Sequence, residues 1–272
     1  MSKITECLEN MRRTGKKGLI PFITAGDPDL AGTVEIAKRL AFAGADLVEL
    51  GIPFSDPVAD GPVIQQASGR ALKSGTTLQG ILEAVREIKK DCSMPLILMG
   101  YYNQIYKYGL RRFTCDAAKA GVSGLIVPDL PHEECGPLRE EAILAGLDLI
   151  PLVAPTTTNP RLEKITAGAC GFIYCVSVTG VTGTREQMGT DLENFTGRVR
   201  RYTSLPLAVG FGIAGPEQAA QTAKLCDAVV VGSAIVKIIA EYNDVSSAGP
   251  AVEKLVSQIR GTLDGLQYTR PK

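Results

Sequence analysis

The sequence predicts an α/β protein built as a (β/α)8 barrel, with an extra helix at its N-terminus. Short apolar, β-rich runs recur along the chain with helical spacing between them, and most are continuous, as expected for parallel strands covered by helices. Eight strand–helix units in about 250 residues are typical of a TIM barrel. A doubly wound sheet is the alternative, but no Gly-x-Gly-x-x-Gly follows the first run. No linker divides the chain, so we expect a single domain over residues 1–272.

The predicted strands follow one another at intervals that leave room for a helix after each. In chain order they are Gly18–Ala25, Leu47–Phe54, Pro95–Tyr102, Gly124–Asp129, Asp148–Ala154, Gly171–Val178, Pro206–Ile213 and Asp227–Ile235. Phrases such as Ala43-Gly44-Ala45-Asp46 stand just before strands, and a glycine there is typical of a helix end that turns into the next strand.

The helices are predicted from apolar stripes. The first 17 residues indicate an amphipathic helix with Ser2 as its N-cap and with Ile4, Leu8 and Met11 on one face. Between the second and third strands, four apolar residues share one helix face while charged residues occupy the other: Ile81, Leu82, Val85 and Ile88. Asp191–Arg201 and Gly215–Leu225 show the same spacing.

Composition excludes several classes of protein. Lys and Arg number 29, as do Asp and Glu, and no basic stripe suggests a nucleic-acid binder. The seven cysteines are scattered without a Cys-x-x-Cys, which indicates reduced thiols rather than a metal or redox site. His132 is the only histidine, so we expect no Ser-His-Asp, Cys-His or poly-His chemistry and no metal. No membrane span or apolar leader is visible, and we expect a cytoplasmic protein.

The segment from Glu49 to Pro62 is the most informative part of the chain. Glu49 follows Leu47 and Val48 in a predicted buried strand, where an uncompensated carboxylate costs several kcal/mol. Asp60 lies in the Pro/Gly-rich loop after the same strand, on the barrel face where active sites form. Two carboxylates in different environments are suited to divide acid and base work. The alternatives are that Glu49 pairs with a structural Arg or Lys, and that Asp60 caps the helix beginning near Pro62.

Two further groups of residues fall at the same end of the predicted barrel. One is a long polar loop, Gly180-Val181-Thr182-Gly183-Thr184-Arg185-Glu186. It has the composition of a mobile active-site lid, and the alternative is an ordinary surface loop. Tyr174, in the strand before it, reaches either a ligand or a core partner. The phrases Val209-Gly210-Phe211-Gly212-Ile213 and Val230-Val231-Gly232-Ser233-Ala234 follow the seventh and eighth strands, where barrels often bind phosphate. The alternative is that these glycines form only tight turns.

The remaining candidates at this rim are weaker. Asp129 ends the fourth strand and either contacts a ligand or orients loops. Phe22, Tyr101, Tyr102 and Asn103 are placed to form an apolar pocket wall, and His132 is expected to be an exposed loop residue. Together these residues predict a site for a phosphorylated small molecule whose apolar part faces the two acids. Such a site is suited to proton transfer coupled to carbon–carbon cleavage or isomerisation.

These phrases resemble the tryptophan synthase alpha subunit family. The resemblance rests on the segment from Glu49 to Pro62, on Gly180-Val-Thr-Gly-Thr-Arg, Val209-Gly-Phe-Gly-Ile and Val231-Gly-Ser-Ala, and on Pro21-Phe-Ile-Thr-Ala-Gly-Asp-Pro28, in order over the whole chain. It implies a (β/α)8 lyase that cleaves indole-3-glycerol phosphate to indole and glyceraldehyde 3-phosphate by retro-aldol acid/base catalysis.

The resemblance also implies roles for individual residues. Glu49 and Asp60 correspond to the catalytic acids. Phe22 corresponds to the indole pocket, and Tyr174 and Thr182 correspond to positions that support the substrate and position Asp60. Gly183, Gly212, Gly232 and Ser233 correspond to the phosphate site. From their place at the rim, Tyr101 and Asp129 are added as expected substrate contacts.

The resemblance implies a partner as well. Family members associate with a pyridoxal-phosphate-dependent beta subunit in an α2β2 heterotetramer, so no cofactor is expected in this chain. Two alternatives stay open at this point: a stand-alone lyase that releases free indole, and a mainly regulatory alpha-type subunit. An epimerase or a Schiff-base aldolase is disfavoured, the latter because no predicted strand core supplies a lysine.

Overall fold

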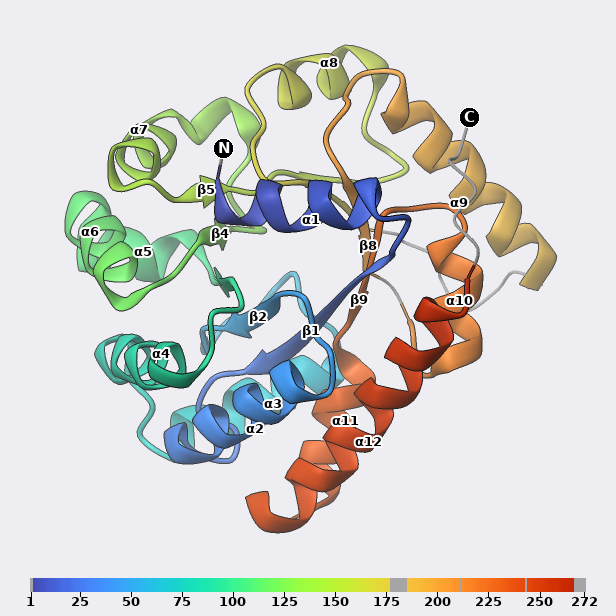
Figure 1. The fold of residues 1–272 in the computed structure, drawn as a ribbon. Coiled ribbons are helices and arrows are strands. Elements are labelled where there is room, and N and C mark those ends of the chain that lie inside the picture. Colours follow the sequence, from blue (N-terminus) through green and yellow to red (C-terminus); the bar gives the residue numbers. More distant parts are fainter. Residues whose placement is uncertain (1, 177–184, 211, 243, 267–272) are drawn as a thin grey trace.

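The computed structural model of the chain describes residues 2–176, 185–210, 212–242 and 244–266. Its parallel strands form a ring at the centre and its helices surround them (Figure 1). The strands are β1 Gly18–Thr24, β2 Val48–Gly51, β3 Leu96–Met99, β4 Gly124–Ile126, β5 Asp148–Leu149, β6 Leu152–Val153, β7 Ile173–Val176, β8 Leu207–Gly210 and β9 Ala228–Val231.

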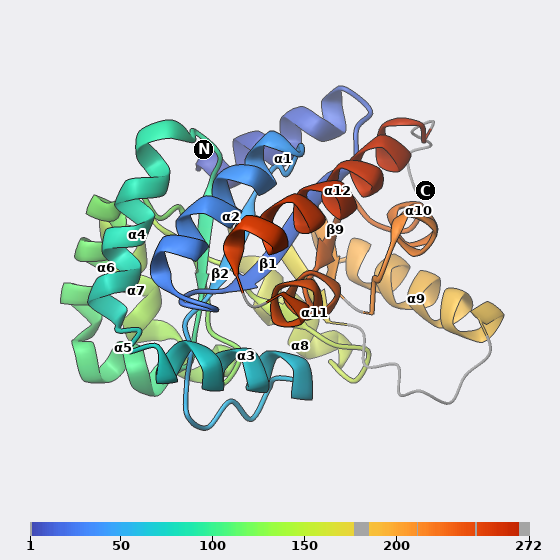
Figure 2. The same ribbon diagram turned by 90° about the horizontal axis from the view of Figure 1, so that it is seen from below.

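The helices are α1 Lys3–Arg13, α2 Leu30–Phe42, α3 Pro62–Lys73, α4 Leu78–Asp91, α5 Tyr102–Tyr108, α6 Leu110–Ala120, α7 Gly136–Ala145, α8 Asn159–Ala167, α9 Arg185–Arg200, α10 Pro216–Ala223, α11 Ser233–Glu241 and α12 Val245–Asp264, with a 3-10 turn η1 at His132–Glu134. Figure 2 shows α2, α11 and α12 side by side over β1, β2 and β9. None of the helices in these described ranges has the length and apolar content that a membrane crossing requires.

The sheet confirms the predicted barrel, with one change. Its order is β5-β4-β3-β2-β1-β9-β8-β7-β6, and the two ends of this order are consecutive in the chain. The predicted fifth strand is divided at Ile150 and Pro151. The Ile150 N–H donates to the Leu125 carbonyl at 2.9 Å on one side, and the Pro151 carbonyl accepts from the Tyr174 N–H at 3.0 Å on the other. The two pieces therefore join β4 to β7, and the eight predicted strand positions form a closed ring.

Helix α1 closes one end of the barrel interior. As predicted, the Ser2 hydroxyl accepts from the Thr5 N–H at 3.2 Å, and Ile4, Leu8 and Met11 are buried. These three side chains belong to one buried cluster with residues in or next to the strands, namely Ile20, Leu47, Ile97, Ile126, Ile150, Phe172, Tyr174, Ala208, Ala228 and Val230. Each aliphatic side chain buried in this way contributes about 1.5–3 kcal/mol. The helix is shorter than the predicted 17 residues because Gly15, with φ of 71°, turns the chain toward β1.

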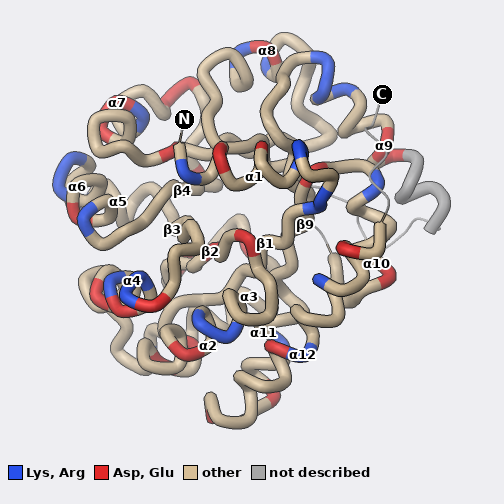
Figure 3. The backbone as a smooth tube through the Cα atoms, viewed as in Figure 1, with Lys and Arg blue, Asp and Glu red and all other residues tan. Residues whose placement is uncertain are grey.

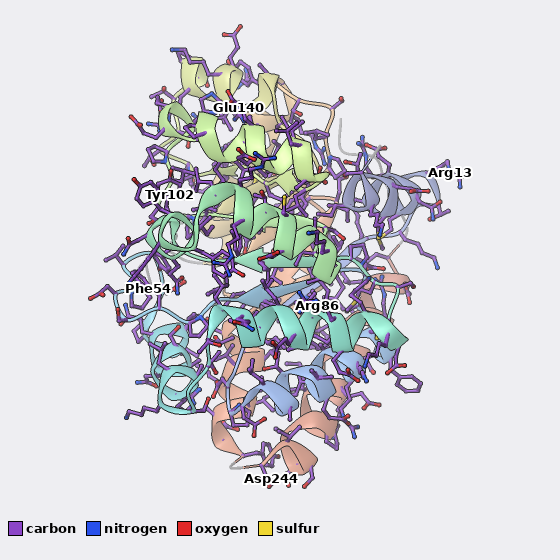
Figure 4. The ribbon with its side chains drawn as sticks, turned by 90° about the vertical axis from the view of Figure 1, so that its left-hand side faces the viewer. Arg13, Phe54, Arg86, Tyr102, Glu140 and Asp244 are labelled. Carbon is purple, nitrogen blue, oxygen red and sulfur yellow. The ribbon has the colours of Figure 1, made fainter. Side chains whose placement is uncertain are left out.

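The opposite end of the barrel is open and carries the loops that follow the strands. In Figure 4, Phe54 and Tyr102 lie at the edge of the molecule away from Arg13 of α1. Basic and acidic residues alternate over the outer helices, as Figure 3 shows, and neither sign forms a continuous face in that view.

Candidate active site at the open end of the barrel

Glu49 projects into the barrel from β2. Leu47 belongs to the interior cluster, whereas Val48 and Leu50 pack outward against the helices, so the alternation of the strand directs Glu49 inward. The side chain is 0% exposed, and in the described part of the chain neither carboxylate oxygen has a hydrogen-bond partner. Burial raises the pKa of Glu49 to about 8. The alternative that Glu49 pairs with a structural Arg or Lys is therefore wrong for the described residues, and the raised pKa keeps Glu49 mostly protonated at pH 7.

Asp60 lies in a different environment, in the loop between β2 and α3. Its carboxylate Oδ2 accepts a hydrogen bond from the Tyr101 hydroxyl at 2.9 Å, and the side chain is half-buried. Burial raises the pKa of Asp60, while the Tyr101 hydrogen bond opposes the rise. The alternative that Asp60 caps the following helix is wrong, because Gly61 is the N-cap of α3. The side chain is thus directed to the site rather than to the helix.

Tyr174 is the third ionisable group of the site, and it lies in β7 with only 9% of its surface exposed. Its pKa is raised mainly by burial, and the carboxyl groups of Glu49 and Asp60 raise it further once they are ionised. Its hydroxyl rests against the backbone of β8, where a Cβ on Gly210 would lie 2.4 Å from it. A residue larger than glycine at 210 would therefore displace this hydroxyl.

Of the four residues predicted to form an apolar wall, Phe22 and Tyr101 border a pocket, whereas Asn103 is exposed and Tyr102 lines neither that pocket nor the cavity that adjoins it. Phe22 is paired with Glu49 across β1 and β2, and a Cβ on Gly51 would lie 2.5 Å from its ring. Phe22, Asp60 and Tyr101 line one pocket, which also includes Met99. Met99 also lines an adjoining cavity of about 820 Å³. That volume is ample for a small molecule with an aromatic part.

Asp129 and Tyr174 line this larger cavity, but Asp129 also has a structural partner. Its Oδ1 accepts from the Tyr102 N–H at 2.9 Å, at the first residue of α5. His132 lines the cavity too. It is half-buried on η1 with its Nδ1 3.2 Å from Arg139 Nη2, so the expectation of an exposed loop residue was wrong.

Of the residues predicted to bind phosphate, the structure describes Gly212, Gly232 and Ser233. Gly212 is exposed with φ of 55°, and Gly232 is the N-cap of α11, which begins at the exposed Ser233. Since Gly232 has no side chain to cap the helix, the first N–H groups of α11 are available to an anion. Thr182 and Gly183 lie outside the described residues, as does the predicted lid loop up to residue 184, whereas its last two residues, Arg185 and Glu186, belong to α9.

A family model described as "Tryptophan synthase alpha chain" matches residues 8–263. The chain belongs to the tryptophan synthase alpha chain family. It is a lyase that cleaves indole-3-glycerol phosphate, as the sequence resemblance implied.

Relatives and solved structures agree with this family. A tryptophan synthase alpha chain of Citrifermentans bemidjiense is 51% identical over 242 residues, which cover 89% of this chain and 91% of the relative. One of Clostridium kluyveri is 44% identical over 264 residues, covering 97% and 100%. A crystal structure of the alpha chain from Legionella pneumophila superposes with a TM-score of 0.90 at 38% identity, covering 99% and 100%. Tryptophan synthase from M. tuberculosis gives 0.87 at 32%, covering 97% and 99%.

Two contacts of this alpha-chain site were not predicted. The sequence argument assigned the glycines of 209–213 to phosphate, yet Gly210 makes room for the Tyr174 hydroxyl. This contact depends on the register Tyr174↔Ala208 between β7 and β8, which places Gly210 two residues further along the neighbouring strand. The hydrogen bond from Tyr101 to Asp60 was also missed, because it joins two loops 41 residues apart.

Proposed function

We propose that Glu49 and Asp60 are the two catalytic acids of indole-3-glycerol phosphate cleavage in this chain. The observation that carries the proposal is the complete burial of Glu49 without a hydrogen-bonding partner among the described residues, beside a pocket lined by Asp60. A protein has little reason to retain such a carboxyl group in a barrel interior except to use its raised pKa.

Each acid has a distinct task in the proposed reaction. Neutral Glu49 delivers its proton to C3 of the indole ring and then, as the carboxylate, takes the proton of the neighbouring side-chain hydroxyl. The bond between C3 and the hydroxyl-bearing carbon breaks, its electrons return to the ring, and that carbon becomes the aldehyde. Asp60, the more polar acid, accepts a hydrogen bond from the indole N–H and shares the positive charge that develops there.

The rest of the proposed site holds the substrate at its two ends. Phe22 and Tyr101 enclose the indole ring, and Tyr174, Asp129 and Thr182 contact the substrate between the ring and the phosphate. Gly183, Gly212, Gly232 and Ser233 bind the phosphate. Support for the phosphate end comes from the φ of 55° at Gly212 and from the uncapped start of α11, where N–H groups and the helix dipole favour an anion.

We also propose that the chain acts in the cytoplasm within an α2β2 assembly whose beta chain holds pyridoxal phosphate. The exposed loop between β2 and α3 supports a contact there, since Val58 is 83% exposed beside the site. A partner bound to this loop would contact the segment that carries Asp60.

The decisive experiment measures indole release by Glu49→Gln, with and without a beta chain. Removing a general acid typically costs a factor of 10²–10⁴, so we expect kcat to fall about that much while the circular dichroism spectrum is retained. Glu83→Gln, on the exposed face of α4, is the matched control and keeps full activity. Wild-type activity in Glu49→Gln would disprove the assignment. The comparison with and without the beta chain measures the coupling to the partner.

A further inference from the structure

The loop that carries Asp60 is hydrogen-bonded to one tyrosine, Tyr101, just before α5. The Tyr101 hydroxyl donates to Asp60 Oδ2 at 2.9 Å and accepts from the Ala59 N–H at 3.0 Å. The same oxygen thus binds the backbone of one loop residue and the carboxylate of the next. Because Tyr101 is only 4% exposed and directly follows β3 and Gly100, its position is determined by the barrel itself.

Two further contacts fix the earlier part of the same loop to this segment. The Phe54 ring stacks on the Tyr101 ring with centroids 5.1 Å apart and planes inclined by 29°. The Gln104 side-chain amide donates to the Pro53 carbonyl at 2.8 Å. The loop between them is otherwise open to solvent, since Ser55, Asp56 and Val58 are exposed. The loop therefore takes its conformation next to the site largely from Tyr101.

We propose that Tyr101 is the positioning residue for Asp60: its hydroxyl holds the carboxylate in place and stabilises it as an anion. The inference rests on the proposed function, in which Asp60 faces the indole N–H. It adds a role to Tyr101 beyond the apolar wall. A hydrogen bond to a charged group is about twice as strong as one between neutral groups. The single Tyr101 hydroxyl can therefore both orient the Asp60 carboxylate and stabilise its negative charge.

The charges around Asp60 determine the direction of the pH effect. Among the described residues, Tyr101 just before α5 bonds to Asp60, and Tyr174 from β7 interacts with both Asp60 and Glu49. Asp129 adds a negative charge near Tyr101. Burial raises the pKa of Asp60 and the Tyr101 hydrogen bond lowers it. Removing that hydroxyl therefore raises the pKa of Asp60, and the anion is lost at a higher pH than in the wild type.

The test compares Tyr101→Phe with Tyr108→Phe. Tyr108 is on α5 as well, and its hydroxyl donates to Asp116 Oδ2 at 2.9 Å, so the control removes an equivalent tyrosine–aspartate bond away from the site. Tyr101→Phe keeps the ring that stacks on Phe54. We expect its kcat for indole-3-glycerol phosphate to fall about tenfold or more, with KM within about twofold and the acid limb of the kcat–pH profile moved to higher pH. Tyr108→Phe should match the wild type in all three.

The possible results distinguish the role of Tyr101 from the roles proposed for Glu49 and Asp60. A raised KM with an unmoved acid limb would make Tyr101 a substrate contact only, and a lower kcat with an unmoved limb would make it only structural. Either result overturns the inference while the roles of Glu49 and Asp60 stand. Asp60→Asn should abolish the acid limb. If that limb persists in Asp60→Asn, the assignment of Asp60 itself fails, and the inference fails with it.

Discussion

Burial of Glu49 should lower the free energy of unfolding by an amount that grows with pH, and replacing Glu49 by Gln should remove this pH dependence. The folded protein holds this carboxyl with a pKa of about 8, against 4.5 for the unperturbed group. Between those values the unfolded chain releases a proton that the folded chain keeps, so folding stability falls by about 1.4 kcal/mol per pH unit. The loss reaches about 3 kcal/mol at pH 7 and about 5 kcal/mol above pH 8. Since the side chain is fully buried, solvent screening does not reduce these values.

The sign follows from the raised pKa. Below pH 4.5 both states are protonated and the cost is absent; as the pH rises toward 8 it grows, and above 8 it is constant. Gln cannot ionise, so its own cost in the barrel is the same at every pH. The difference in unfolding free energy between Glu49→Gln and the wild type should therefore increase in favour of the variant by about 1.4 kcal/mol per pH unit from pH 5 to 8.

Urea titrations at pH 5, 6, 7 and 8 measure this difference. The chain has eight tyrosines and no tryptophan, so far-ultraviolet circular dichroism is the appropriate signal. Glu83→Gln, at an exposed site, should show a difference that does not change with pH. If the difference for Glu49→Gln is equally constant, then Glu49 titrates as an ordinary solvated acid and the argument from burial is refuted.

Two other substitutions test how the site is supported. Gly210→Ala should displace the Tyr174 hydroxyl, cost about 1–3 kcal/mol in urea unfolding and lower kcat for indole release. Gly197→Ala, with open space around it on α9, should leave kcat unchanged and raise the unfolding free energy by up to about 1 kcal/mol. Arg70→Met should cost about 2–4 kcal/mol, because it leaves the buried Asp27 carboxylate without the two guanidinium bonds of 2.8 and 2.7 Å that Arg70 makes. A change below about 0.5 kcal/mol in calorimetry or urea unfolding would contradict the expectation for Arg70→Met.

The fold was predictable because its signals are local. Continuous apolar runs, helix stripes and glycine helix ends each depend on a few neighbouring residues, and together they require eight strand–helix units. The division of the fifth strand was not predicted, although Pro151 is visible in the sequence. Proline removes one N–H, but whether the sheet continues past it depends on which neighbour accepts the bonds on either side, here Leu125 and Tyr174.

The site was predictable in its residue types more than in its contacts. An acid after two apolar strand residues already indicated an unusual Glu49, and the structure adds that it has no hydrogen-bonding partner among the described residues. The capping interpretation of Asp60 was wrong because Gly61 and Pro62 begin α3 without it. The bond to Tyr101 joins the segments that follow the neighbouring strands β2 and β3, which only the folded sheet brings together, so no local pattern could have indicated it.

The different environments of the two acids follow from where each lies on one strand–loop unit. Glu49 is on β2, and a shift of one residue along the strand would exchange it with Val48 or Leu50, whose side chains fill the outer core. Its burial is therefore maintained by the whole strand register, at a cost of a few kcal/mol that the barrel core offsets. Asp60 lies nine residues beyond the end of β2, on a loop without such a register, and depends on single contacts such as the one from Tyr101. Substitutions that loosen the loop should thus alter the reaction while leaving stability nearly unchanged, whereas those at Glu49 alter both.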